Sequence, residues 1–200
     1  MRLLLPLFPL LGYGDSPAWC GDLVRAADAR GDLVYDVRVP FSRQPQDILD
    51  FLATEVVPPS REDPLRDVLG ADQAHDIRAP LTEHHVKLFD ADHFGSSVVS
   101  RDMYVLARAS IVIVDANLAG FGEHMVMATY AHLLGCPVWM VNDRLLLSPF
   151  LAEISSLVVS SSKVTDLLMM SSPETTTLPA KVPVTAALVD PFDDGMGDSG

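Results

Sequence analysis

The sequence is poor in positive charge. Its 200 residues contain 14 Lys and Arg against 27 Asp and Glu, which gives a formal net charge of −13. Because nucleic-acid binding requires cationic side chains that neutralise phosphates, this balance argues against nucleic acid as a partner. A small neutral or weakly charged ligand in a pocket remains compatible with it.

Cysteine and glycine-rich motifs are also scarce. Cys20 and Cys136 are the two cysteines, and no CxxC or Cys/His zinc spacing is present. None of the six histidines has the i, i+4 spacing of a helical metal motif, so no metal site is predicted. Gly120-x-Gly122 is too short for a dinucleotide fingerprint or a phosphate loop. Cys136 adjoins an apolar run and is interpreted as a buried free thiol, which favours a reducing compartment.

Long apolar runs are absent as well, so no membrane span is predicted. The run Leu3–Leu11 has the length of a signal-peptide core, but Pro6 and Pro9 interrupt it and no Ala-x-Ala cleavage site follows. We therefore expect a buried first strand there rather than a secretion signal.

Hydrophobic residues make up 48% of the chain and the mean hydropathy is +0.24, as in a packed globular protein. We expect residues 1–170 to form a single α/β domain with a mostly parallel sheet of about five strands and helices on both faces. Residues 171–200, rich in Thr, Pro and Asp, are expected to be a mostly disordered tail.

Periodicity and turn residues predict the elements. Strands are expected at 3–7, 33–39, 111–115, 137–141 and 157–160. Helices are expected at 18–30, 46–54, 64–69, 100–109, 122–134, 148–155 and 163–170, with Ser16 and Ser100 as N-caps of two of them. Gly31 and Gly135 are expected just past the ends of the first and fifth of these helices. The interval 40–98 is interpreted as an insertion or lid, irregular from 75 to 94.

The most informative stretch runs from Arg101 to Val141. A helix precedes the buried strand Ile111–Asp115, and the loop Gly120-Phe121-Gly122 leads into a second helix and a second buried strand. Such a loop leaves the carboxyl end of a strand and enters a helix amino terminus, where α/β proteins usually bind ligands.

Several residues near this loop have both a structural and a functional interpretation. Glu123, in the first turn of its helix, is either a helix-start acid favoured by about 0.3–1 kcal/mol through the helix dipole or a nucleophile shielded from water by Phe121 and Met127. Asp102, expected in the first turn of its own helix, is either another dipole-favoured acid or a carboxylate that binds a hydroxyl or shares a proton with Glu123.

Asp115 and Asn117 follow the buried strand. Each either hydrogen-bonds the amides of residues 118–120 as a turn residue or contacts substrate. Tyr13 and Trp19 flank the loop after the first strand and either stack on an aromatic ligand or pack in the core.

Matching residues in this unit resemble one enzyme family. They are Asp102, Ser110, Ile111–Asp115, Gly120-Phe121-Gly122, Ala128, Ala131 and Gly135-Cys136-Pro137-Val138. In composition and spacing they resemble the nucleoside 2-deoxyribosyltransferase family, together with its relatives that hydrolyse the N-glycosidic bond of nucleoside monophosphates. The resemblance covers about a third of the chain. It implies a flavodoxin-like (Rossmann-like) α/β fold.

The resemblance also implies a catalytic carboxylate. The family's nucleophilic Glu stands eight residues before the Gly of Gly-x-Pro, and Met127 occupies that position here. Glu123 lies one turn earlier on nearly the same helix face. Either Glu123 attacks the sugar, or the carboxylate is missing and a binding fold remains.

We therefore expect an enzyme that cleaves or exchanges the N-glycosidic bond of a nucleoside or nucleotide. Glu123 would be the nucleophile, Asp102 would position the sugar or protonate the base, and Asp115, Asn117, Gly120, Gly122, Tyr13, Trp19 and Met127 would surround the substrate. We expect no cofactor, no metal, no nucleic acid and no membrane partner, a cytoplasmic location, and a homo-oligomer. The alternative is a catalytically inactive nucleotide-sensing or interaction domain of the same fold.

Overall fold

The computed structural model describes residues 1–7, 16–61, 64, 66, 67, 70, 77–91, 96–117, 122–144 and 147–171. The side chains at positions 59, 91, 96–98 and 123 lie outside this description. The predictions for Tyr13, for Gly120 and for the tail beyond residue 171 also fall outside it.

Five parallel strands form one sheet in the order β2-β1-β3-β4-β5. Their bounds are β1 (Leu3–Leu7), β2 (Leu33–Val34), β3 (Ile111–Asp115), β4 (Val138–Val141) and β5 (Leu157–Val159). Every residue of β1, β3 and β4 is buried. Strands covered on both faces need apolar residues at every position, which explains their uninterrupted apolar sequences. The predicted parallel sheet of an α/β domain is confirmed.

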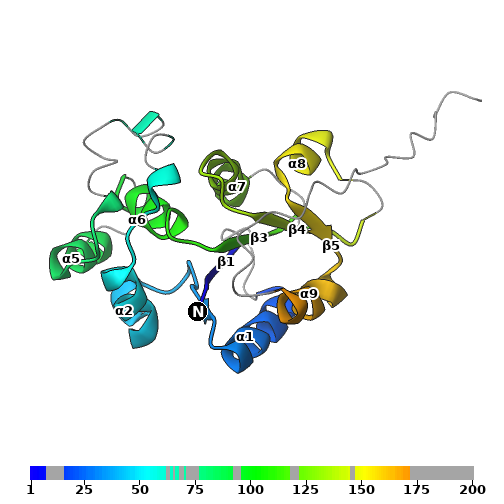
Figure 1. Cartoon of the computed structure of the whole chain (residues 1–200), viewed down its shortest axis with the longest axis horizontal. Helices are drawn as coiled ribbons and strands as arrows, with labels where there is room; N and C mark the ends of the chain where they lie inside the picture. Colours follow the sequence, from blue (N-terminus) through cyan, green and yellow to red (C-terminus); the bar gives the residue numbers. More distant parts are fainter. Residues whose placement is uncertain are drawn as a thin grey trace, which may run out of the picture.

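Helices cover both faces of the sheet (Figure 1). On one face lie α1 (Ala18–Arg30) and α9 (Val164–Met170), which contact each other. On the other face lie α6 (Ser96–Leu106), α7 (Glu123–Leu133) and α8 (Pro149–Ile154). Positive φ angles of 68° at Gly31 and Gly135 end α1 and α7 in the left-handed conformation, as the sequence predicted.

The strand order reverses between β1 and β3. From β1 the chain moves outward to β2, then returns across the sheet to β3, so that α1 and α6 lie on opposite faces. In sheets of this order, the crevice at the carboxyl ends of the two strands is the usual place for a ligand.

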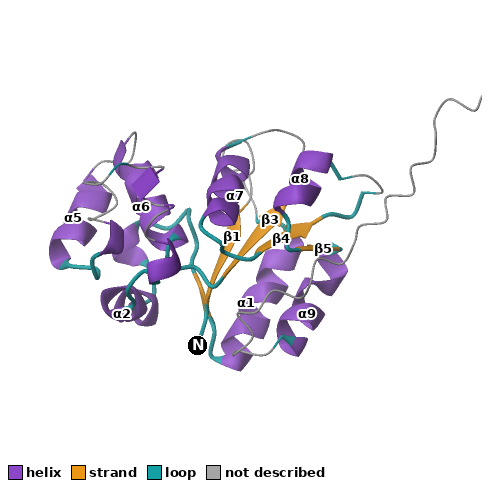
Figure 2. Cartoon of the chain, turned by 45° about the horizontal axis from the view of Figure 1, so that its top comes forward, coloured by secondary structure: helices purple, strands orange, loops and turns teal. Residues whose placement is uncertain are grey.

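The predicted insertion contains helices. In its described part, α2 (Gln46–Thr54), α5 (Glu83–Ala91) and the 3-10 turns η1 (Phe41–Arg43) and η2 (Pro59–Arg61) form a helical layer beside the β2 edge (Figure 2). The prediction of an irregular segment at 75–94 is therefore wrong for α5. The sequence signal was weak because Phe89 is the one fully buried residue described in α5, while Glu83 and Lys87 form an exposed i, i+4 ion pair of 2.7 Å.

Two buried arginines fasten this layer to the sheet domain. Arg108, 4% exposed, donates hydrogen bonds to five backbone carbonyls, among them those of Glu55, Ile77 and Ala79. Its guanidinium carbon lies 3.7 Å from the centre of the Tyr104 ring, and burial lowers the pKa of Arg108 to about 10. Arg61 donates to the carbonyls of residues 107 and 109 at 2.6 and 3.0 Å. The insertion is thus held by charge-assisted hydrogen bonds to backbone oxygens.

Three differences from the predicted boundaries change the interpretation of a residue. The second strand ends at Val34 instead of residue 39, because the Asp36 carboxylate accepts the Arg38 amide and the Asp36 carbonyl accepts the Val39 amide, which forms a turn. Helix α6 begins at Ser96, so Ser100 lies inside it and is not its N-cap. Helix α1 begins after Pro17 without a side-chain cap, so Ser16 does not cap it.

At the amino ends of β1 and β2, a buried ion pair ties the residue before β1 to the short loop after α1. Arg2 Nη2 lies 2.6 Å from Asp32 Oδ2, and the Asp32 side chain is 3% exposed. Arg2 and Arg30 also donate to the hydroxyl and the carbonyl of Ser171. Ser171, the last described residue, therefore belongs to the packed domain. In the described part of the chain, no helix has the length and apolar character that a membrane span requires.

Candidate functional site

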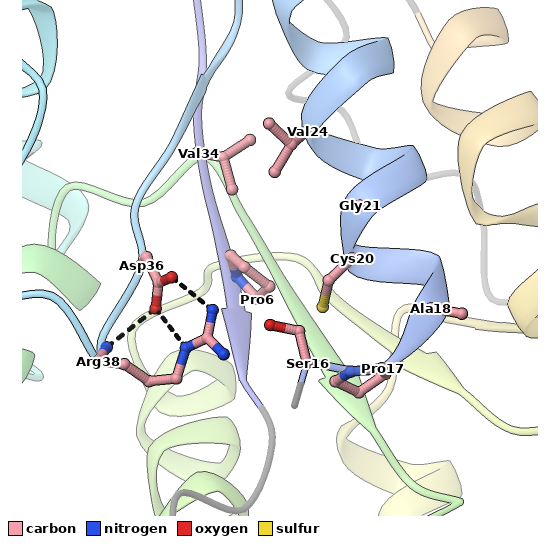
Figure 3. A pocket seen from close by; sticks show the side chains of 10 residues that line it. All are labelled: Pro6, Ser16, Pro17, Ala18, Cys20, Gly21, Val24, Val34, Asp36 and Arg38. Atoms are coloured by element: carbon pink, nitrogen blue, oxygen red, sulfur yellow. Dashed lines mark hydrogen bonds and ion pairs between the residues drawn. The ribbon is translucent and has the colours of Figure 1, made fainter. Parts of the chain in front are cut away.

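A pocket of about 320 Å³ opens at the carboxyl ends of β1 and β2, in front of the amino terminus of α1 (Figure 3). This volume lies at the small end of the range of about 300–1,000 Å³ for ligand pockets. One wall comes from the start of α1, and the other comes from β2 and the segment that follows it. Pro6 of β1 forms the floor between them.

An ion pair forms the polar rim of the pocket. Arg38 donates from Nε to Asp36 Oδ1 at 2.9 Å and from Nη2 to Asp36 Oδ2 at 2.6 Å, and its backbone amide also donates to Oδ1. Burial disfavours the charged carboxylate, but the hydrogen bonds and charge of Arg38 outweigh burial and lower the pKa of Asp36. Asp36 therefore stays an ionised hydrogen-bond acceptor at neutral pH.

The segment after β2 that carries Asp36 and Arg38 is held in place by hydrogen bonds to its backbone carbonyls. Gln44, 5% exposed, donates from its amide nitrogen to the carbonyls of Asp36 and Val39 at 2.7 and 3.0 Å. Arg101 of α6 donates to the carbonyl of Val37 at 3.3 Å. The backbone that carries Asp36 is therefore set by both the insertion and α6.

The opposite wall of the pocket is apolar and open. Val24 of α1 is 50% exposed, although it is a large apolar residue, and it faces Val34 of β2 in Figure 3. Gly21 lies between Val24 and the start of α1, and a Cβ added there would meet only Arg25 Nη1, at 3.8 Å. A flat apolar group can therefore reach this wall.

Cys20 of α1 places a thiol in the lining of the pocket. Burial, together with the nearby charge of Asp115, raises its pKa to about 12. The thiol is therefore protonated at neutral pH and does not act as a nucleophile there. The residue before Cys20, Trp19, donates a hydrogen bond to Asp115 at the end of β3, so the pocket adjoins that strand end.

Asp115 and Trp19 are bonded to each other. The Trp19 indole donates from Nε1 to Asp115 Oδ2 at 2.9 Å, and the Asn117 amide donates to Asp115 Oδ1 at 2.8 Å. Trp19 is 5% exposed and Asp115 is 2% exposed, so both belong to the packed structure. Trp19 is thus a core residue, one of its two interpretations, and Asp115 accepts the amide of Asn117, while the predicted contacts with the amides of residues 118–120 lie outside the described residues.

Asn117 connects the ends of neighbouring strands. Its side chain donates to Asp143 Oδ2 at 3.0 Å and accepts the Asp143 amide at 2.6 Å. Asp143 Oδ1 in turn accepts the amide of Ser161 at 2.8 Å. The carboxyl ends of β3, β4 and β5 are thereby joined by side-chain hydrogen bonds.

Asp102 is in an ion pair with its neighbour. Arg101 Nη2 lies 2.7 Å from Asp102 Oδ1, and the Asp102 side chain is 12% exposed. Asp102 is the seventh residue of α6, so its predicted place in the first turn is wrong, and the helix-dipole explanation no longer applies to it. The Asp102 carboxylate instead balances the charge of the Arg101 guanidinium, which donates a hydrogen bond to the Val37 carbonyl in the segment after β2.

The start of α7 holds the remaining predicted residues. Gly122 precedes α7 in an extended conformation, and a Cβ there would lie 3.1 Å from Nδ1 of the buried His124. Glu123 is the first residue of α7. Met127 is 8% exposed and packs in the core on the sheet face shared with α6. The two helices that carry Asp102 and Glu123 are neighbours on one face of the sheet, and Asp102 is not among the described residues that line the pocket.

No family model, no curated protein and no solved structure matches this chain.

Asp36 and Arg38 are the charged residues of the described pocket lining, and the sequence analysis did not single them out. A signal for them exists: an acid placed shortly after the second strand of a β-α-β unit, about 20 residues beyond the first loop, is where dinucleotide-binding folds hold ribose hydroxyls. That signal was missed because residues 33–39 were predicted to be one strand. Among the described residues, no three His, Cys, Asp or Glu side chains lie close enough together to hold a metal ion.

Proposed function

We propose that this protein binds a nucleoside or nucleotide at the carboxyl edge of its sheet and cleaves or exchanges the N-glycosidic bond. The observation that carries this proposal is the pocket beside the β1–β3 reversal, which combines an ionised carboxylate, Asp36, with two facing apolar side chains, the half-exposed Val24 and the partly buried Val34. A sugar with a flat base needs both: an acceptor for hydroxyls and an apolar surface for the ring.

Glu123 is the proposed nucleophile. It opens α7 on the segment that follows β3, where the helix amino terminus stabilises negative charge. Its carboxylate would attack the anomeric carbon, forming a C–O bond as the C–N bond breaks, and the base would leave with its electron pair and take a proton from solvent water. Water or a second base would then release the sugar from the enzyme. Asp102, paired with Arg101, suits positioning of the sugar better than proton donation, because the ion pair favours its ionised form.

Base release tests this proposal. Each common nucleoside and its 5′-monophosphate is incubated with the protein, and free base is measured by chromatography. Glu123→Gln preserves size and removes the charge, so we expect the rate to fall by at least about a hundredfold. The matched control is Glu83→Gln, which makes the same change in the first turn of α5, on an exposed side chain outside the pocket. Equal rates in parent and Glu123→Gln would remove Glu123 from the mechanism.

A second candidate function is a nucleotide-sensing domain without catalysis. It is favoured by Met127, which stands where the related enzymes have their nucleophile and is buried in the core. Asp115 and Asn117 are likewise bonded to protein groups. Ligand binding without base release from any tested nucleoside or monophosphate would favour this candidate over the enzyme.

A further inference from the structure

We propose that the pocket selects an uncharged nucleoside over its 5′-monophosphate, and that Asp36 is the residue that sets this preference. The inference rests on the proposed function in taking a nucleoside or nucleotide as the ligand, and it names which of the two the pocket accepts.

The charges around the pocket argue for a neutral ligand. Asp36 and Arg38 form a pair whose charges cancel, and no lysine and no second arginine contribute to the described lining. Asp115, which accepts a hydrogen bond from Trp19, the residue before Cys20, is a further acid close to the pocket. The amino terminus of α1 contributes roughly half a positive charge. A phosphomonoester carries about 1.5–2 negative charges at neutral pH, far more than this positive end balances.

The hydrogen-bonding capacity of the pocket suits a sugar. An ionised carboxylate offers about four acceptor positions, and the three donors of Arg38 leave room for one more donor on Asp36. A sugar hydroxyl is such a donor, whereas a phosphate oxygen is an acceptor that Asp36 would repel. The Ser16 side chain points toward the same space in Figure 3 and adds a second hydroxyl partner.

The apolar wall completes the orientation of the ligand. With the sugar at Asp36, the base lies along Gly21, Val24 and Val34. Burying the exposed side of Val24 against a ring removes apolar surface from water on both partners. Pocket size agrees with this pose, since about 320 Å³ suits one nucleoside better than a dinucleotide.

Asp36→Asn should change the affinities for the nucleoside and for its 5′-monophosphate in opposite directions. The change weakens the hydrogen bond to the sugar hydroxyl and removes the negative charge that repels a phosphate. We expect affinity for the nucleoside to fall by about tenfold or more, as for loss of a hydrogen bond to a charged group, while affinity for the 5′-monophosphate rises. The affinities of adenosine, guanosine, cytidine, uridine and their 5′-monophosphates for parent and variant are measured by titration calorimetry.

Asp22→Asn is the matched control. Asp22 is also paired with an arginine close by in sequence, Arg25, but it is exposed on α1 and does not line the pocket. If the effect came only from net charge, this variant would raise monophosphate affinity as much as Asp36→Asn. We expect it to leave both affinities unchanged.

Three outcomes would overturn the inference: tighter binding of the monophosphates to the parent, an equal loss of both ligand classes in Asp36→Asn, or no binding of any nucleoside. These outcomes are separable from those of the proposed function. Base release from monophosphates alone would retain the enzyme and reject the inference. If the parent binds nucleosides without releasing the base, and Asp36→Asn lowers nucleoside affinity while raising monophosphate affinity, the inference is retained and the enzyme is rejected.

Discussion

The carboxyl edge of the sheet has two halves that differ in how their polar groups are used. In the half formed by β3, β4 and β5, Asp115, Asn117 and Asp143 are bonded to protein donors and acceptors. In the half formed by β1 and β2, Asp36 and Arg38 are about one-third exposed beside an open pocket. Polar residues at the same edge are therefore bonded to neighbouring elements in one half and border a pocket in the other.

A variant that weakens the fold without changing either half of the carboxyl edge serves as the reference. Asp32 lies at the amino end of the sheet, just before β2. Asp32→Asn removes the partner of the buried Arg2 guanidinium, so we expect a loss of about 3 kcal/mol in the free energy of unfolding at pH 7. Burial disfavours the Asp32 carboxylate, but the hydrogen bonds from Arg2 outweigh this and lower its pKa.

A lowered pKa fixes the sign of the pH dependence. The unfolded chain binds the proton at a higher pH than the native protein, so the Asp32 contribution is complete above about pH 4 and is lost as pH falls toward the native pKa. Urea unfolding at pH 7 and pH 3.5 should show the difference between parent and Asp32→Asn shrinking at the lower pH. A constant difference would mean that the ion pair does not set the native pKa.

Asp115→Ala tests the half formed by β3, β4 and β5. The change removes the acceptor of the Trp19 indole and of the Asn117 amide, and it leaves a buried indole N–H without a partner. We expect a loss of about 2 kcal/mol in urea unfolding. Asp36→Ala is the comparison at the other half, and we expect its stability to change much less. Equal losses would show that both halves serve the fold alike.

The sequence predicted the residues of this edge that leave a local signal, but not the roles of residues that depend on distant contacts. The buried strands and Gly135 were located because apolar runs and left-handed glycines leave strong local signals. The roles of Asp115 and Trp19 were left open because the two residues are 96 positions apart, and their bond exists only once β1 and β3 pair. Asp36 was missed for a local reason: apolar residues at alternate positions suggested a strand where a side-chain turn forms.

Asn117→Ala should have a smaller effect. Its side chain exchanges two hydrogen bonds with Asp143, in a partly exposed region where water can replace them. We expect a loss of about 1 kcal/mol in urea unfolding and no change in the affinity for nucleosides. A large drop in that affinity would place a ligand contact in the half that we assign to structure.

The smallest expected effect on stability comes from Gly21→Leu, which tests the open half through its apolar wall. Gly21 is a helical residue with room beside it, since an added Cβ meets only the end of the Arg25 side chain at 3.8 Å. Replacing glycine in a helix by leucine should raise the free energy of unfolding by about 0.5–1 kcal/mol. The new side chain occupies the wall where the base is proposed to lie, so we expect nucleoside affinity to fall by about tenfold or more, roughly the effect of 1.4 kcal/mol. Ala29→Leu, on an exposed position of the same helix outside the pocket lining, is the control and should leave affinity unchanged. Because the variant is expected to be at least as stable as the parent, a lost affinity cannot be attributed to unfolding. If Gly21→Leu binds nucleosides as the parent does, the base does not lie on this wall.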